Sequence, residues 1–190
     1  MIELACKTLR KWIDAGYPIV PLSVNQSRIL FYQSNYITQL QEIINRYEID
    51  PSLLILEITE GTALDNISEI NTVIEELHKM GLEVSMDDFG SGYSSFNVLK
   101  DFPIDELKLD RVFLSETGDV YKRNMILTSI ASLANNLNMK TVVEGIETKE
   151  QAQFAQSIGC DIGQGYYFSK PISIEDFKNT FFRNEPPCFL

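Results

Sequence analysis

Short β-rich segments alternate with amphipathic helical segments along almost all of this chain, and this alternation most limits its fold. Six segments have the apolar, β-branched composition of strands: 19–25, 52–59, 82–88, 104–110, 140–147 and 161–169. Helical periodicity marks five others: 2–16, 66–81, 123–139, 149–159 and 173–182. Strands that alternate with helices predict parallel βαβ units, in a sheet covered by helices.

Two architectures fit such a pattern, an open doubly wound sheet and a closed (β/α) barrel. An open sheet takes its functional residues from two or three strand ends at one switch point. Here every predicted strand has a polar residue at or near its carboxyl end: Asn25, Glu57, Asp87 with Asp88, Lys108, Glu144 and Gln164. A ring of strand ends around one mouth favours the α/β barrel of the TIM type. Because that barrel has eight strands in about 250 residues, the six found here predict an incomplete barrel.

Composition narrows the classes of function. The 190 residues carry a net charge of −11, which argues against broad contact with DNA or RNA phosphates. No apolar run is long enough to cross a membrane, and the first residues lack the apolar centre of a signal peptide. We therefore expect a single cytoplasmic domain over 1–190, with no DNA or membrane contact and with free thiols. The one histidine, His78, excludes a multi-histidine zinc site, and we expect it to be solvated at a helix end.

Two adjacent aspartates, Asp87 and Asp88, follow the third predicted strand and precede the segment GSGYSS (90–95). Adjacent carboxylates repel each other, and neighbouring side chains on a regular strand point to opposite faces. The pair could cap a short helix that begins near Ser94. The glycine-rich segment lacks the spacing of a phosphate-binding loop, so we interpret it as a loop that covers or aligns a site.

The strand ends together predict a metal site. Several carboxylates in one place need a cation to offset their repulsion, and oxygen ligands suit Mg²⁺ or Mn²⁺. Such an ion could activate water for phosphodiester hydrolysis, with Glu144 or Lys108 orienting or deprotonating that water. Each residue alone also has an ordinary explanation, since strand-end Asn and Glu are often caps or solvated, and Lys108 could pair with Asp105 or Asp110 on the surface.

Six segments resemble the signature segments of the EAL domain family: SVNQS, LEITE, DDFGSGYSS, LKLDR, VVEGIET and GCDIGQGYYFSKP. The resemblance runs from the first helix to Pro171, with the segments in the family's order. It implies a (β/α) barrel and a bacterial phosphodiesterase that uses Mg²⁺ or Mn²⁺ to hydrolyse cyclic di-GMP to linear pGpG.

The resemblance also implies roles for individual residues. The implied metal ligands are Asn25, Glu57, Asp87 and Asp88. Lys108 and Glu144 are implied to position and activate the attacking water, and Gln164 to border the substrate. Glu60 would hold the loop after the aspartate pair in place, and Glu147 would support the site from outside.

One family feature is missing from these 190 residues. The Glu-Ala-Leu segment, whose Glu is a metal ligand in the family, does not occur, and Glu3 in IELA lies in a helical pattern. We expect an N-terminal truncation without the first two strands, and weak or undetectable hydrolysis by the isolated chain. The alternative is a non-catalytic cyclic di-GMP sensor or protein-interaction module, and a third option is an unrelated α/β binding domain.

An incomplete barrel also exposes two parallel strand edges, which are templates for pairing with another chain. Three outcomes are open: dimerisation across the edges, completion by strands from a separate polypeptide, or a rearranged fold. We favour self-association.

Overall fold

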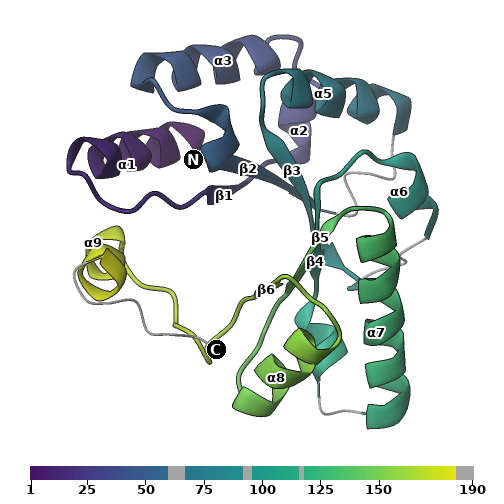
Figure 1. Ribbon diagram of the computed structural model, residues 1–190. Helices are drawn as coiled ribbons and strands as arrows, with labels where there is room; N and C mark the ends of the chain where they lie inside the picture. The colour runs from purple at the N-terminus through teal and green to yellow at the C-terminus, as the bar shows by residue number, and fades with distance from the viewer. Residues whose placement is uncertain (60–66, 92–95, 116–117, 183–190) are drawn as a thin grey trace.

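Six parallel strands form one curled sheet in the computed structural model, which describes residues 1–59, 67–91, 96–115 and 118–182 (Figure 1). The strands are β1 (Leu22–Asn25), β2 (Leu54–Thr59), β3 (Glu83–Phe89), β4 (Glu106–Leu109), β5 (Lys140–Val143) and β6 (Ile162–Gly163). They lie in the sheet in the order of the chain, so no switch point interrupts them. The predicted incomplete barrel is therefore confirmed, and the open doubly wound sheet is excluded.

Helices cover the convex side of this half-barrel (Figure 1). The longer ones are α1 (Ile2–Asp14), α3 (Tyr36–Tyr47), α5 (Ile67–Lys79), α7 (Val120–Asn136) and α8 (Lys149–Ser157). The shorter helical segments are α2 (Arg28–Phe31), η1 (Pro51–Leu53), α6 (Phe96–Asp101), η2 (Arg111–Leu114), α9 (Ile174–Phe177) and η3 (Lys178–Phe182). The sequence reasoning missed α3, although Tyr36, Leu40 and Ile44 form its buried stripe at four-residue spacing.

Most strands are shorter than the sequence predicts, and β5 and β6 differ most because glycines turn the chain. β5 ends at Val143, and Gly145 then adopts a φ of 72°, which residues with a side chain rarely adopt. β6 has only two residues, and Gly165 then passes so close to the backbone of Ile146 that a methyl group there would overlap it. The segment predicted as a strand over 161–169 is therefore a strand only at 162–163, and it turns at 166–168 after passing against the loop that follows β5.

Alternation along the strands separates an apolar layer from a polar one. Leu54, Leu56 and Ile58 of β2 are fully buried, as are Ile70 and Ile74 of α5 in the same core. Burying each such side chain contributes about 1.5–3 kcal/mol. The alternate positions face the barrel interior, where the charged side chains of the site lie.

At the amino ends of the strands, Asp105 joins β3 to the turn before β4. Its Oδ2 accepts hydrogen bonds from the Val84 amide at 2.7 Å and pairs with His78 Nε2 at 2.8 Å. His78 lies in the last turn of α5 as predicted, but its side chain is only about one-third exposed. The prediction of a solvated histidine is therefore wrong, because the carboxylate of Asp105 holds the ring.

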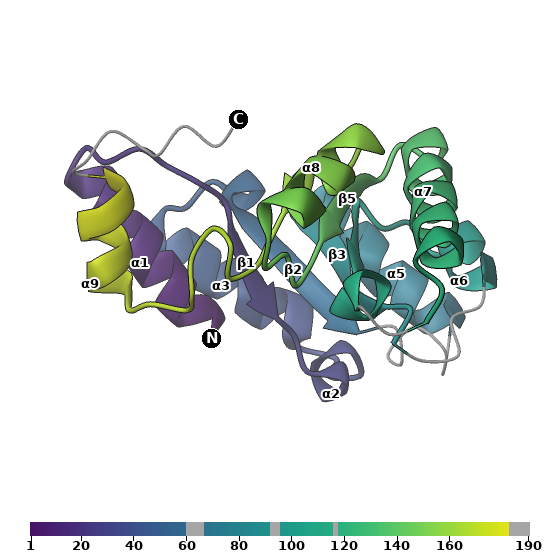
Figure 2. The same cartoon turned by 90° about the horizontal axis from the view of Figure 1, so that it is seen from below.

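The C-terminal helical segment returns to the first helix, and α9 lies beside α1 in both views (Figure 2). Trp12 of α1 stacks on Phe177 with ring centroids 5.8 Å apart and meets Phe182 edge-on at 4.9 Å. Cys6 and Cys160 are free thiols, and Cys188 is outside the described residues. None of the described helices is long and apolar enough to cross a membrane.

Candidate functional site

Lys108 is the centre of a charged cluster at the carboxyl ends of four strands. Its Nζ lies 2.9 Å from Glu57 Oε1, 2.7 Å from Asp87 Oδ1 and 2.8 Å from Glu144 Oε1. The residue is only 5% exposed, because it sits on the inner face of β4 with β2 and β3 on one side and β5 on the other. The alternative that Lys108 pairs with Asp105 or Asp110 on the surface is wrong.

A break in the β3 ladder explains the adjacent aspartates. The register between β3 and β4 shifts between Met86 and Phe89, and Asp88 has a φ of 59°. A bulge of this kind re-aims a side chain that would otherwise point to the opposite face. Oxygen atoms of Asp87, Asp88 and Glu144 consequently all lie within 4.8 Å of one another.

The electrostatics of the cluster leave negative charge in excess. Burial raises the pKa of the Glu144 carboxyl, and the charges of Asp87 and Glu57 raise it further against the effect of Lys108. Burial and Asp87 likewise raise the pKa of Asp88. Burial alone would lower the pKa of Lys108, but its hydrogen bonds to the three carboxylates outweigh this, so the ammonium stays charged. One ammonium therefore faces four carboxylates in this part of the described chain.

This donor set fits a small divalent cation. Mg²⁺ binds oxygen ligands at about 2.0–2.1 Å, so opposite ligands lie about 4.2 Å apart. Oxygen atoms of Asp87, Asp88 and Glu144 lie within 4.8 Å of one another, near enough to approach a common ion. A dication would also neutralise the excess carboxylate charge that raises the pKa values of Asp88 and Glu144.

The other predicted residues lie at the same end of the sheet or outside the described part. Asn25 ends β1 and is in register with Glu57 on the neighbouring strand, and its side chain is exposed. Gln164 follows β6 and is exposed, and its backbone N–H donates to the Val143 carbonyl at 2.8 Å. Glu147 is exposed in the β5 loop, where its amide donates to Gln151 Oε1 at 2.7 Å. Glu60, and positions 92–95 of the GSGYSS segment, are outside the described residues.

Sequence reasoning missed one buried carboxyl beneath the cluster. Glu106 is 3% exposed on the inner face of β4, two residues before Lys108. It accepts a hydrogen bond from Ser85 Oγ at 2.8 Å, and burial raises its pKa. The signal was present in IDELKLD, where Glu106 and Lys108 alternate with leucines and therefore share one face of the strand.

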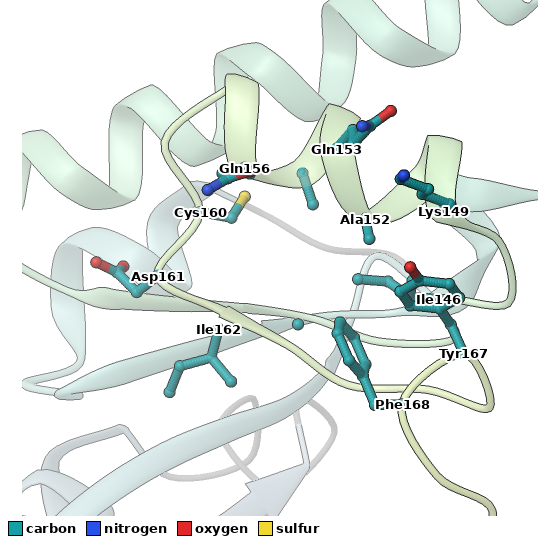
Figure 3. A pocket seen from close by; sticks show the side chains of 12 residues that line it. Ile146, Lys149, Ala152, Gln153, Gln156, Cys160, Asp161, Ile162, Tyr167 and Phe168 are labelled. Atoms are coloured by element: carbon teal, nitrogen blue, oxygen red, sulfur yellow. The ribbon is translucent and has the colours of Figure 1, made fainter. Parts of the chain in front are cut away.

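Two cavities lie beside the C-terminal strands of the sheet. The larger, about 670 Å³, lies between α8 and β6, with Ile146, Tyr167 and Phe168 on one side of it, and none of the predicted site residues lines it (Figure 3). The smaller, about 410 Å³, is lined by Arg111, Gly145 and Glu147 among others, and therefore adjoins the loop that carries Glu144.

Comparison with protein-family models decides the family. The model described as "EAL domain" matches residues 1–171, which is most of the chain. This chain belongs to the EAL domain family.

Relatives of this EAL domain are larger signalling proteins. It is 36% identical over 175 residues to the bifunctional diguanylate cyclase/cyclic di-GMP phosphodiesterase MucR of Pseudomonas aeruginosa, covering 92% of this chain and 26% of MucR. It is also 36% identical over 178 residues to the signaling protein YkoW of Bacillus subtilis, covering 94% of this chain and 22% of YkoW. The chain thus spans about a quarter of the length of these curated relatives.

Solved EAL structures share the fold. The phosphodiesterase MucR of P. aeruginosa in complex with c-di-GMP superposes with a TM-score of 0.85 at 36% identity, covering 93% of this chain and 71% of that one. The EAL domain of Mycobacterium smegmatis DcpA gives a TM-score of 0.86 at 31% identity, covering 93% and 80%.

Proposed function

We propose that this EAL domain is a metal-dependent phosphodiesterase that hydrolyses cyclic di-GMP to linear pGpG. The observation that carries the proposal is the cluster in which Lys108 bridges Glu57, Asp87 and Glu144, with Asp88 turned toward the same point. The relatives named above support the substrate, since one is a cyclic di-GMP phosphodiesterase and its structure contains c-di-GMP.

The residues divide into those that hold the ion and those that act on water. Asn25, Glu57, Asp87 and Asp88 would hold Mg²⁺ or Mn²⁺, at strand ends that meet at one edge of the sheet. The ion, when bound, supplies a water of lowered pKa and stabilises charge on the phosphoryl oxygens.

Glu144 serves as the base. Its raised pKa makes it a better proton acceptor than an exposed glutamate, and Lys108 Nζ holds its carboxylate at 2.8 Å, in a fixed orientation. Gln164, at the end of β6, borders the substrate. Glu147 would support the site from outside, and the role of Glu60, which lies outside the described residues, remains a prediction from the sequence.

Incubation of the chain with cyclic di-GMP and Mn²⁺, followed by chromatography for pGpG, tests the proposal. Product should form in Mn²⁺ or Mg²⁺, disappear in EDTA and disappear in Glu144→Gln. The enzyme concentration should be high enough for slow turnover to be detected. Product formation that is unchanged in EDTA or in the variant would refute the mechanism. Binding of cyclic di-GMP in Mn²⁺ without any product would instead favour the sensor alternative.

We also propose that the chain self-associates through the edges of its sheet. Within the described sheet, β1 and β6 each pair with a single neighbouring strand, and Ile162 of β6 is 46% exposed. Open edges of this kind favour pairing between copies. Sedimentation velocity at micromolar concentration should detect a dimer, and a clean monomer would count against the proposal. The cytoplasmic location and the single-domain boundary at 1–190 remain predictions from the sequence.

A further inference from the structure

The short helix η2, Arg111–Leu114, lies between the loops that follow β3 and β5, which adjoin the site carboxylates. It follows β4 directly, and Asp110 caps it by accepting a hydrogen bond from the Val112 amide at 2.7 Å. Its last residue, Leu114, is 5% exposed and belongs to the hydrophobic core. The helix is therefore anchored to the sheet at both of its ends.

On one side, η2 contacts the loop after β3. The ring of Phe113 lies so close to Gly90 that a methyl group on Gly90 would overlap two of its carbon atoms. Gly90 has a φ of 96° and follows Asp88 by two residues. The ring therefore limits where the loop that directly follows the two aspartates can lie.

On the other side, η2 contacts the loop after β5. A methyl group on Gly145, which follows Glu144, would overlap the Cβ of Arg111. Gln151 of α8 adds a second link, because its Nε2 donates to the Leu114 carbonyl at 3.4 Å while its Oε1 accepts from the Glu147 amide at 2.7 Å.

We propose that η2 is a spacer that sets the distance between the aspartate pair and Glu144, with Phe113 as the principal positioning residue. This inference rests on the proposed metal-dependent function, because the groups it positions are the proposed metal ligands and base. Phe113 would act through its contact with Gly90. Loss of the ring would let the β3 loop move toward η2 and separate oxygens that now lie within 4.8 Å of one another.

Calorimetric titration with Mn²⁺ tests this in matched pairs of variants. Phe113→Ala should weaken Mn²⁺ binding about 10- to 100-fold, the usual effect of losing a residue that supports metal ligands. Val112→Ala is the control, since Val112 is in the same helix but is 47% exposed. Gly90→Ala should also weaken binding, whereas Gly118→Ala should not, because Gly118 has a similar φ of 91° and no atom within 4 Å of an added methyl.

The double variant Gly90→Ala/Phe113→Ala separates positioning from backbone strain. Removing the ring opens space for the new methyl group, so the double variant should bind Mn²⁺ more tightly than the product of the two single losses predicts. Additive losses, or wild-type affinity in Phe113→Ala, would overturn the inference. If Phe113→Ala does not fold, Phe113→Leu takes its place with a smaller expected loss.

Hydrogen exchange provides a readout that does not need the metal. Without Mn²⁺, Phe113→Ala should exchange faster than the wild type over 87–91 and 144–148, and Val112→Ala should not. Failure of the wild-type chain to bind Mn²⁺ would refute the proposed function, while unchanged exchange in both loops would refute the spacer itself.

Discussion

Replacing Lys108 with methionine removes the only ammonium group that the structure places among the described site carboxylates, while keeping a long unbranched side chain. In the wild type, Nζ lies 2.7–2.9 Å from oxygens of Glu57, Asp87 and Glu144, and these three side chains are 8%, 14% and 17% exposed. The variant leaves them close together without their counter-charge.

Removing one partner of a buried ion pair costs about 3–5 kcal/mol. We expect Lys108→Met to lower the free energy of unfolding by about 3 kcal/mol at pH 7.5 without divalent ions. This value is at the lower end of the range because the carboxylates can take up protons. The pKa of Glu144 is already above its ordinary value of 4.5 in the folded protein, and loss of Lys108 raises it further. A protein with a carboxyl whose pKa is raised by folding becomes less stable as the pH rises above the pKa of that carboxyl in the unfolded chain. The cost should therefore be small near pH 4.5 and grow toward neutral pH.

Urea denaturation followed by circular dichroism, in EDTA and across pH 4.5–8, measures this cost. Lys140→Met is the matched control: Lys140 pairs with Glu83 at 2.8 Å, but its side chain is 52% exposed, so the loss should not exceed about 1 kcal/mol. Added Mn²⁺ should stabilise Lys108→Met more than the wild type, because the ion replaces the lost positive charge. A stability equal to that of the wild type at pH 7.5, or a loss independent of pH, would refute the reasoning.

Two further predictions concern stability. In EDTA above pH 4.5, Glu144→Gln should be more stable than the wild type, because glutamine removes the cost of ionising a buried carboxyl; a less stable variant in urea denaturation would contradict this sign. Trp12→Ala should cost about 3–5 kcal/mol, as large-to-small changes of buried aromatics do, because Trp12 contacts both Phe177 and Phe182. Limited proteolysis should then cut near α9 first, and an unchanged cleavage pattern would argue against the anchoring role.

Much of the fold was predictable because local pattern and tertiary packing agree. The apolar positions of β2 and α5 repeat with the strand and helix periods, and those periods alone place parallel strands under helices. Helix α3 was missed although its buried residues repeat every four positions and Asn35, a residue type favoured at helix N-caps, precedes it. The bounds of β5 and β6 were wrong because Gly145 and Gly165 turn the chain through close approaches that have no local signature.

The candidate site was predictable as a set of residue types but not as a geometry. Polar residues at strand ends identified Glu57, Lys108 and Glu144, since the carboxyl ends of parallel strands meet at one edge. Glu106 was overlooked although its alternation with leucines in IDELKLD puts it on the same strand face as Lys108, and only the structure shows that this face is buried.

The sequence by itself determined the alternation of strands and helices, the family and the chemical character of the site, because these depend on periodicity and on which side chains the chain carries. Only the tertiary structure decided that Asp87 and Asp88 serve one site, that Lys108 joins three carboxylates, and that η2 separates their loops. The physical reason is that a register shift and an ion pair are relations between strands. Strands of one curled sheet place atoms within 3 Å of each other that lie dozens of residues apart along the chain, as in the 2.9 Å contact between Lys108 on β4 and Glu57 on β2.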